Sequence, residues 1–175
     1  MVKQIELRRH TDNNGDVLTQ AGVEAAVEIG ANLTGGYRFV ASSDARRALQ
    51  TSACILAGFA ETVPGGVIVE PGLRSRREDD WRAAYSNAGK GDMGSLREAD
   101  PDLVNEDSAE LAEGLRRLFT RLEDGERALA IGHSPTSEAA VFGLTGEVIE
   151  PLSKGEGVVI TADDEEFAVQ GRLEV

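Results

Sequence analysis

Short apolar runs and amphipathic stretches alternate along the first third of the chain. The run Val2–Leu7 predicts a first strand, and Phe39–Ala41 predicts a second. Thr19 has the side chain of a helix N-cap, and after it small and aliphatic residues recur at helical spacing: Ala21, Ala25, Ala26, Ile29 and Leu33. A second helix is predicted from about Ala45 to Ala57. This order of strand, helix, strand and helix is typical of an α/β fold with a largely parallel sheet.

The middle of the chain is less regular. Val67–Val69 predicts a short strand, residues 77–85 a short helix, and residues 87–95 a flexible loop. Residues 11–16, near the start of the chain, likewise predict a polar loop. Hydrophobic periodicity is weakest around residues 70–107, so we expect a small cap or insertion there that sets substrate specificity.

The last third returns to regular elements. A helix is predicted from near Ser108 to Leu122, because leucines recur there at helical spacing. The remaining elements are a strand, a helix and an antiparallel hairpin, at residues 128–131, 135–142, and 158–160 with 167–169. Together they predict one domain over residues 1–175: a three-layer αβα sandwich with a mostly parallel central sheet and a C-terminal antiparallel edge hairpin.

The amino-acid composition excludes several classes of protein. Hydrophobic residues make up 41% and charged residues 28% of the chain, which excludes a disordered sequence. No apolar run approaches the roughly 18 residues that a membrane span needs, and residues 1–7 show no secretory signal. The single cysteine, Cys54, excludes an internal disulfide and favours a reducing, cytoplasmic location.

The net charge of the chain limits the kinds of partner that we expect. The formal net charge is −13, from 31 acidic and 18 basic residues. Such a field repels nucleic acids and anionic membranes, so neither is expected as a partner. A protein of this charge that handles an anion needs a local cationic pocket to oppose its own field.

The residues of greatest chemical interest follow predicted strands. The only two histidines, His10 and His133, each come just after one, and Arg9 immediately precedes His10. Arg46 and Arg47 open the helix after another strand. Because ligand sites in α/β sheets lie at the carboxyl ends of strands, these side chains are expected to share one crevice. Guanidinium groups bind phosphate oxygens in a bidentate manner, and a neutral imidazole is a competent nucleophile toward phosphorus.

Four segments resemble the signatures of one family, the histidine phosphatase or phosphoglycerate-mutase-like superfamily. Residues 7–11 (LRRHT) resemble its RHG signature, and residues 18–22 (LTQAG) resemble its LTxxG segment. Residues 42–51 (SSDARRALQT) resemble SSPxxRAxQTA, and residues 131–135 (IGHSP) resemble the segment around its second histidine. The segments follow in the family's order over most of the chain. The small size and the Gly-His-Ser-Pro run look closest to the short bacterial branch that contains phosphohistidine phosphatases.

This resemblance implies a role for each matching residue. His10 would be the nucleophile that forms a phosphohistidine intermediate, and Arg9 and Arg47 would hold the phosphate oxygens. His133 would be the second histidine of the pocket, donating to the phosphoryl group during transfer. Thr11 and Ser134, next to the two histidines, would contribute to substrate binding. The scheme needs no metal and no other cofactor.

The sequence departs from the family pattern at Thr11, at Asp44 and at the expected proton donor. Asp44 stands where proline is common, which is a change at the start of a helix. Thr11 stands where the family usually has glycine, so its hydroxyl either adds a donor or narrows the pocket. Mutase-like members carry a proton-donating glutamate in an LRE segment, but the matching position here is Ser75. Three acidic residues follow closely, and of these Glu78 is the candidate that we choose for the role, with Asp79 and Asp80 left open. A substrate with a good leaving group, such as a phosphoramidate, would need no strong acid at all.

The resemblance implies a phosphatase that hydrolyses a phosphomonoester or a phosphohistidine. Its substrate would be a phosphorylated small molecule or a phosphohistidine protein. Two alternatives stay open: a non-catalytic phosphate-binding module on the same fold, and a phosphoglycerate-type mutase. A mutase needs a longer insertion than the span from Gly58 to Asp107 provides, so hydrolysis is preferred. The alternating stretch 167–175 leaves both a monomer and a homodimer open.

Other chemistries fit the sequence less well. Residues 12–16 begin like a calcium loop, but Val17 and Val23 occupy the positions that need glycine and glutamate. Two isolated histidines without clustered cysteines give weak support for zinc. Residues 132–136 lack the closing glycine of a serine hydrolase elbow, and no G-x-G-x-x-G or Walker motif is present.

Overall fold

A six-stranded sheet forms the centre of the protein. The structure is a computed structural model that describes residues 1–175. The strand order is β5-β4-β6-β1-β7-β8, with β1 parallel to β6 and antiparallel to β7. The strands are β1 (Lys3–Arg9), β4 (Tyr37–Ser42), β5 (Val67–Val69), β6 (Arg127–Gly132), β7 (Gly157–Asp163) and β8 (Glu166–Leu173). The expected mostly parallel sheet with an antiparallel hairpin at its C-terminal edge is confirmed.

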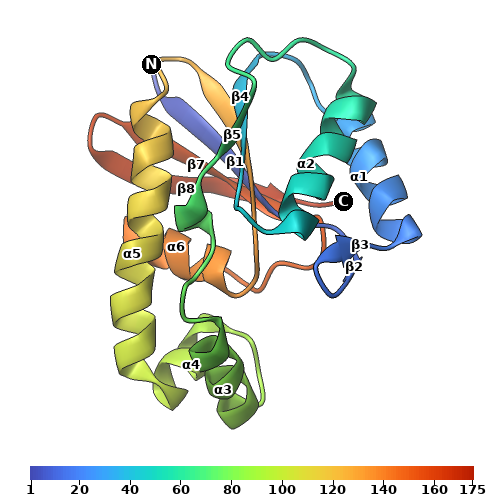
Figure 1. The fold of residues 1–175 in the computed structure, drawn as a ribbon. Helices are drawn as coiled ribbons and strands as arrows, with labels where there is room; N and C mark the ends of the chain where they lie inside the picture. Colours follow the sequence, from blue (N-terminus) through green and yellow to red (C-terminus); the bar gives the residue numbers. More distant parts are fainter.

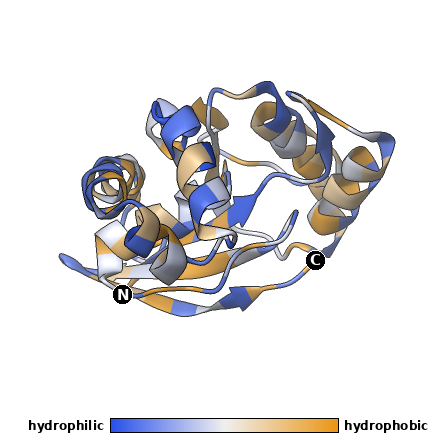
Figure 2. Ribbon diagram, turned by 90° about the horizontal axis from the view of Figure 1, so that it is seen from below, coloured by the Kyte–Doolittle hydropathy of each residue, from blue (hydrophilic) through white to orange (hydrophobic).

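Helices cover both faces of this sheet (Figure 1). On one face lie α1 (Gln20–Asn32) and α2 (Arg46–Phe59), and on the other lie α5 (Pro101–Thr120) and α6 (Thr136–Thr145). Figure 2 shows apolar residues along much of the sheet, whereas the helices alternate between polar and apolar residues. The predicted three-layer αβα sandwich is therefore the observed architecture.

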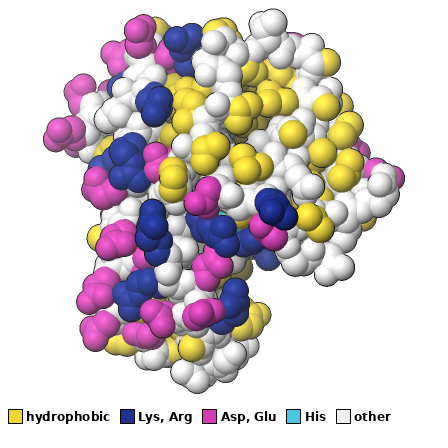
Figure 3. Space-filling view, viewed as in Figure 1, with side chains coloured by type: hydrophobic (Ala, Val, Ile, Leu, Met, Phe, Trp, Pro, Cys, Tyr) yellow, Lys and Arg dark blue, Asp and Glu magenta, His cyan; other side chains and the backbone are white.

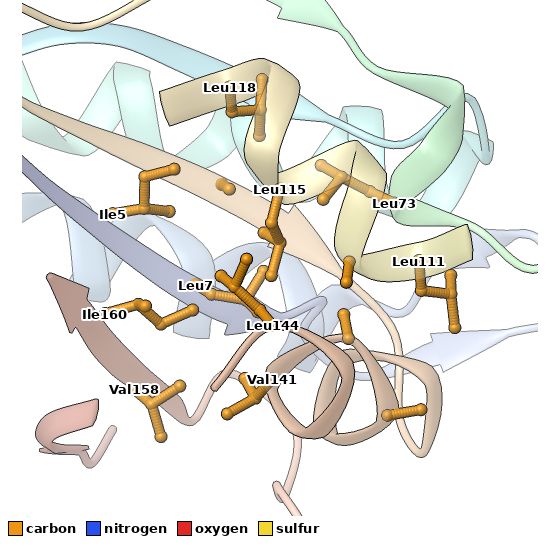
Figure 4. Packing of buried hydrophobic residues seen from close by; sticks show 14 of the residues in the cluster. Ile5, Leu7, Leu73, Leu111, Leu115, Leu118, Val141, Leu144, Val158 and Ile160 are labelled. Carbon is orange, nitrogen blue, oxygen red and sulfur yellow. The ribbon is translucent and has the colours of Figure 1, made fainter. Parts of the chain in front are cut away.

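The inner strands are buried on both faces, which explains their continuous apolar runs. On β6, Ala128 and Ala130 pack toward α5 and α6, whereas Leu129 and Ile131 pack toward α1 and α2. Leucines of α5 and residues of α6 meet the side chains of β1 and β7 in the larger of these two cores (Figure 4). A strand of this kind does not alternate between apolar and polar residues, because neither face meets water.

The first helix begins at the predicted N-cap. The Thr19 hydroxyl accepts a hydrogen bond from the Gly22 N–H at 3.0 Å. Gly22 itself has no room for a side chain, because a Cβ there would lie 2.0 Å from the Asp12 carbonyl oxygen. The LTxxG segment thus packs the start of α1 directly against the loop that follows His10.

Three expectations about local structure are wrong. The polar loop expected at residues 11–16 is instead part of a small hairpin. Its strands are β2 (Asn13–Asn14) and β3 (Val17–Leu18), and it turns at Gly15, whose φ is +63°. The flexible loop at 87–95 is instead the end of one helix and the start of another. The helix expected from Ser108 begins seven residues earlier, at Pro101. In this last case the polar run at residues 105–108 interrupts the apolar period, and Asp100 supplies the cap.

Residues 78–99 form a small lobe at one end of α5 (Figure 1). Its helices are α3 (Glu78–Ala88) and α4 (Met93–Ala99), and the short 3₁₀ turn η1 (Pro71–Leu73) precedes it. Figure 3 shows cationic and anionic side chains interleaved over this lobe. No helix of the protein is both long enough and apolar enough to span a membrane.

A buried carboxylate anchors the lobe to α5. Asp107 Oδ2 accepts hydrogen bonds from the Ser75 hydroxyl and from the Trp81 indole N–H, both at 2.6 Å. All three side chains are 5% exposed or less. The Ser75 hydroxyl also accepts from the Arg77 N–H, so the network sets where α3 begins. Trp81 is therefore chiefly a packing residue, although its ring also lines a cavity beside the histidines.

Candidate active site

The two histidines meet at the carboxyl ends of adjacent parallel strands. Arg9 at the end of β1 pairs with Gly132 at the end of β6, so the residues that follow them, His10 and His133, lie side by side. Their ring centroids are 5.2 Å apart, with 60° between the ring planes. Both are buried, at 5% and 6% exposure. Two residues that are 123 positions apart in the chain thus share one pocket, as the parallel sheet predicts.

The backbone sets the tautomer of His10. Its Nδ1 lies 2.8 Å from the Thr11 carbonyl oxygen. A carbonyl oxygen only accepts hydrogen bonds, so Nδ1 carries the proton of the neutral ring. Nε2 therefore keeps its lone pair and makes no hydrogen bond to the protein. This is the nitrogen that is able to attack phosphorus.

His133 is held by a hydroxyl that the sequence analysis did not single out. Its Nε2 lies 2.7 Å from Ser43 Oγ, and that hydroxyl also accepts a hydrogen bond from the Ala45 N–H. If the Ser43 hydroxyl donates to Nε2, the proton of the neutral ring is on Nδ1. Nδ1 is buried and has no partner in the protein, so it is available as a donor to a bound anion.

The surroundings of both imidazoles favour the neutral form of the ring. Burial lowers the pKa of His10 to about 4. The hydrogen bond with the Thr11 carbonyl oxygen opposes this shift, and the charges of Lys154, Arg47 and Arg9 add to it. Burial also lowers the pKa of His133 to about 2, with Arg47 as the largest charge effect. A neutral imidazole is the nucleophilic form, so the environment of His10 keeps it reactive at physiological pH.

We expect neither histidine to titrate in the folded protein between pH 8 and about pH 5, whereas both titrate near ~6.5 in the unfolded chain. Below about pH 6.5 the unfolded chain binds more protons, so the free energy of unfolding falls as the pH decreases toward 4. Above about pH 6.5 these two groups make no pH-dependent contribution. NMR of the imidazole Cε1–H protons in phosphate-free buffer measures both values. A His10 resonance that titrates near ~6.5 in the folded protein would contradict this account.

Arg47 lies in the first turn of α2 and faces the same pocket. Its Nη1 donates to Asp16 Oδ1 at 2.9 Å, and its Nη2 lies 3.9 Å from Glu78 Oε1. Asp16 also accepts from the Arg47 backbone N–H. The carboxylate of Asp16 thus orients the guanidinium and leaves donors on its far side for a ligand.

Arg9 is tied to the loop that leads into β7. Its Nη1 donates to the Leu152 carbonyl oxygen at 2.8 Å, and its Nε has no partner. The N–H of the same residue, Leu152, donates to Glu138 Oε1 at 2.8 Å. Glu138 is 1% exposed, and burial raises its pKa. The Leu152 peptide therefore links Arg9 to a buried carboxyl group at the start of α6.

The hydroxyls of Thr11 and Ser134 have partners inside the protein. Thr11 Oγ1 donates to the Gly22 carbonyl oxygen at 2.8 Å, and the side chain is 1% exposed. Ser134 Oγ donates to Glu138 Oε1 at 2.5 Å. In this arrangement neither hydroxyl proton points to the space between the histidines. Thr11 at the family's glycine position packs the His10 loop against α1.

Glu78, the first residue of α3, reaches the pocket from the lobe. Its Oε1 accepts from Arg74 Nε at 2.6 Å, and this hydrogen bond holds the pKa of the Glu78 carboxyl below its usual value. A cavity of about 250 Å³ lies between Glu78, His133 and the exposed ring of Tyr85. Glu78 is thus an ionised carboxylate beside the second histidine. Asp79 and Asp80 are exposed, and neither lines this cavity.

Several residues of the site escaped sequence analysis. Asp16, Ser43 and Glu138 each orient a predicted site residue, and Lys154 adds a further cation next to His10. Asp16, Glu138 and Lys154 are single polar residues outside the segments that resemble the family. Only Ser43 carried a signal, because it belongs to the segment that resembles SSPxxRAxQTA.

Comparison with known proteins shows the family of the chain. The sequence profile of the histidine phosphatase superfamily (branch 1) matches residues 2–154. The chain belongs to this superfamily. No curated protein matches the chain. The recognition of the histidine phosphatase family from its four segments is therefore confirmed.

Solved structures of the histidine phosphatase fold superpose on nearly the whole chain. A phosphoglycerate mutase from Bacillus anthracis has 16% identity and a TM-score of 0.71, with 97% of this chain and 92% of that chain covered. A phosphoserine phosphatase from Entamoeba histolytica in complex with 3-phosphoglyceric acid has 15% identity and a TM-score of 0.73, with 99% and 98% covered. The protein histidine phosphatase SixA complexed with tungstate has 19% identity and a TM-score of 0.63, with 97% and 96% covered. These similarities establish the fold.

Proposed function

We propose that this histidine phosphatase hydrolyses phosphate groups through a covalent intermediate on His10. The observation that carries the proposal is the His10 ring itself: Nδ1 is held by the Thr11 carbonyl, and Nε2 is free in a pocket with a second histidine and two arginines. Phosphoryl transfer depends mainly on positioning and on stabilisation of charge, and this pocket supplies both.

In the first step the Nε2 lone pair of His10 attacks phosphorus, and the bond from phosphorus to the leaving group breaks. Arg9 and Arg47 bind the phosphoryl oxygens, and His133 donates to one of them from Nδ1. In the second step a water oxygen attacks phosphorus and the P–N bond breaks, which releases orthophosphate and the neutral imidazole. Glu78, which the hydrogen bond from Arg74 keeps ionised, would accept the proton of that water.

The substrate class follows from the weak acid function of the site. An ionised Glu78 is a poor proton donor, so the first step favours leaving groups that need little protonation, such as an aryl phosphate or a phosphoramidate. We therefore favour a phosphohistidine or an activated phosphomonoester as substrate. A cytoplasmic setting fits a chain with one free cysteine. The scheme is proposed without a metal, because the cationic side chains of the pocket would stabilise the charge of the phosphoryl group.

Trapping the intermediate tests this function. After brief reaction with ³²P-labelled p-nitrophenyl phosphate or a phosphohistidine peptide and an alkaline quench, we expect acid-labile label on the peptide that contains His10. Glu78→Gln should accumulate more label than the native protein, because hydrolysis of the phosphoenzyme loses its base while formation is spared. Label on serine or aspartate, or turnover that chelators abolish, would refute the proposal. Asp79→Asn, at the exposed neighbour of Glu78, is the matched control.

A further inference from the structure

One cation of the pocket comes from a loop outside the four family-like segments. Lys154 precedes β7, and its half-buried side chain lies beside the two arginines and His10. Among the charges near His10, the ammonium of Lys154 has the largest effect on the pKa of the imidazole, ahead of Arg47 and Arg9. The ammonium therefore acts electrostatically on the nucleophile, as the guanidinium groups do.

The backbone around Lys154 is fastened to the strand that carries the nucleophile. The Gly155 N–H donates to the carbonyl oxygens of Arg9 and His10, at 3.2 and 3.3 Å. The Gly155 carbonyl oxygen accepts from the buried Arg8 guanidinium at 2.9 Å. A Cβ at Gly155 would lie 3.1 Å from Ile29 and Val175 side-chain atoms, and φ is +80°, which favours glycine. The loop thus has a set position from which Lys154 faces the pocket.

The charge of Lys154 lacks a direct counterion in the protein. Its only hydrogen-bond partner is the uncharged Asn13 side chain, in the β2–β3 hairpin, and it forms no salt bridge. Arg9 also forms no salt bridge, whereas Arg47 is paired with Asp16. Arg9 and Lys154 thus act on each other electrostatically, and the acidic groups that act on them, Glu138 and Asp12 respectively, form no salt bridge with them. Mutual repulsion of this kind is relieved when an anion binds between the cations.

We infer that Lys154 is a phosphate-binding residue that closes the pocket from the β7 side and acts on the phosphoryl oxygens together with Arg9 and Arg47. This inference rests on the proposed function, because it assumes that the anion is the phosphoryl group of the substrate. Lys154 would favour dianionic phosphoryl groups over singly charged anions, since a third cation adds attraction for each negative charge.

Binding of orthophosphate and tungstate to Lys154→Met and Lys154→Arg, measured by titration calorimetry, tests the inference. We expect Lys154→Met to weaken binding by about tenfold or more and Lys154→Arg to stay within about threefold of the native protein. KM for p-nitrophenyl phosphate should rise in Lys154→Met by a similar factor. The matched control is Lys90→Met, at an exposed lysine between α3 and α4.

The pKa of His10 provides a second readout that a merely structural role would not move. The charged or titratable groups around it are Arg9 on β1, Arg47 on α2, His133 after β6, and Lys154. Removing the Lys154 charge should raise the pKa of His10 above about 4, and Lys154→Arg should leave it in place.

The possible outcomes separate this inference from the proposed function. In one outcome the native protein binds tungstate and this binding depends on Lys154, but neither turnover nor a phosphoenzyme is seen. That result would refute the proposed function and leave the inference about Lys154 standing. Normal turnover with equal anion affinity in Lys154→Met and Lys90→Met would overturn the inference alone. Loss of the fold in both Lys154→Met and Lys154→Gln would make Lys154 a structural residue and would also overturn it.

Discussion

Replacing His10 by alanine is expected to lower kcat/KM for p-nitrophenyl phosphate by at least about 10³-fold, because no other group in the pocket is placed to accept the phosphoryl group. His133 is the only other imidazole, but its Nε2 is engaged with the Ser43 hydroxyl and its Nδ1 then carries the proton, so it has no free lone pair. Initial rates near pH 7, in the presence of a chelator, measure the loss.

Anion binding serves as the control for His10→Ala. Arg9, Arg47 and Lys154 all remain in this variant, so affinity for tungstate should change by less than about tenfold. A thermal unfolding curve close to that of the native protein would show that the pocket is intact. Undiminished turnover in such a folded variant would remove His10 from the mechanism.

Replacing Asp107 by alanine is expected to lower the free energy of unfolding by about 3 kcal/mol, because two buried donors lose a charged acceptor. The donors are the Ser75 hydroxyl and the Trp81 indole, and the alanine side chain offers neither a hydrogen bond nor a path for water. For a chain of this size the midpoint of thermal unfolding should fall by roughly 6–12 °C. Calorimetry and urea titration measure the two quantities independently.

Asp107→Asn is the matched control for this stability prediction. Both donors reach the same oxygen, Oδ2, and an asparagine carbonyl in that place accepts both hydrogen bonds. We expect its cost to stay within about 1 kcal/mol. A loss in Asp107→Asn as large as that in Asp107→Ala would show that charge, and not hydrogen bonding, holds the network together.

The hydrogen-bond network of Asp107 and the active site are linked through the start of α3. Ser75 accepts from the Arg77 N–H, and the next residue is Glu78, whose carboxylate reaches the pocket. Loosening Asp107 therefore displaces a residue of the active site without touching the histidines. Asp107→Ala should slow hydrolysis of the phosphoenzyme more than its formation, which is the pattern expected of Glu78→Gln.

Most of the strands and the central pair of histidines were predictable. Continuous apolar runs such as Ala128–Ile131 stand out because strands buried on both faces admit few polar residues. The polar residues directly after such runs are then expected at one edge of a parallel sheet, which is where His10 and His133 lie. Arg47 was predictable as well, because it belongs to a long segment that resembles the family.

The lobe between η1 and α5 was less predictable. The glycine and charged residues of 87–95 favour a loop, yet Gly89 ends α3 in a left-handed conformation and Asp92 caps α4. The buried face of these helices is small, and Trp81, Met93 and Leu96 give it no clear period. The lobe depends on its contacts with α5, and above all on Asp107, which has no local pattern at all.

The sequence by itself determined the α/β architecture, the family, and the two histidines and two arginines of the pocket, because these depend on periodicity and on contiguous motifs. Only the tertiary structure decided which nitrogen of His10 is free, that Thr11 and Ser134 donate to protein oxygens, and that Lys154 joins the pocket. Those features arise from contacts between elements far apart in the chain, such as Lys154 with Asn13 and His133 with Ser43. The physical reason is that a hydrogen bond or a charge effect depends on distance in space, whereas a sequence pattern records only distance along the chain.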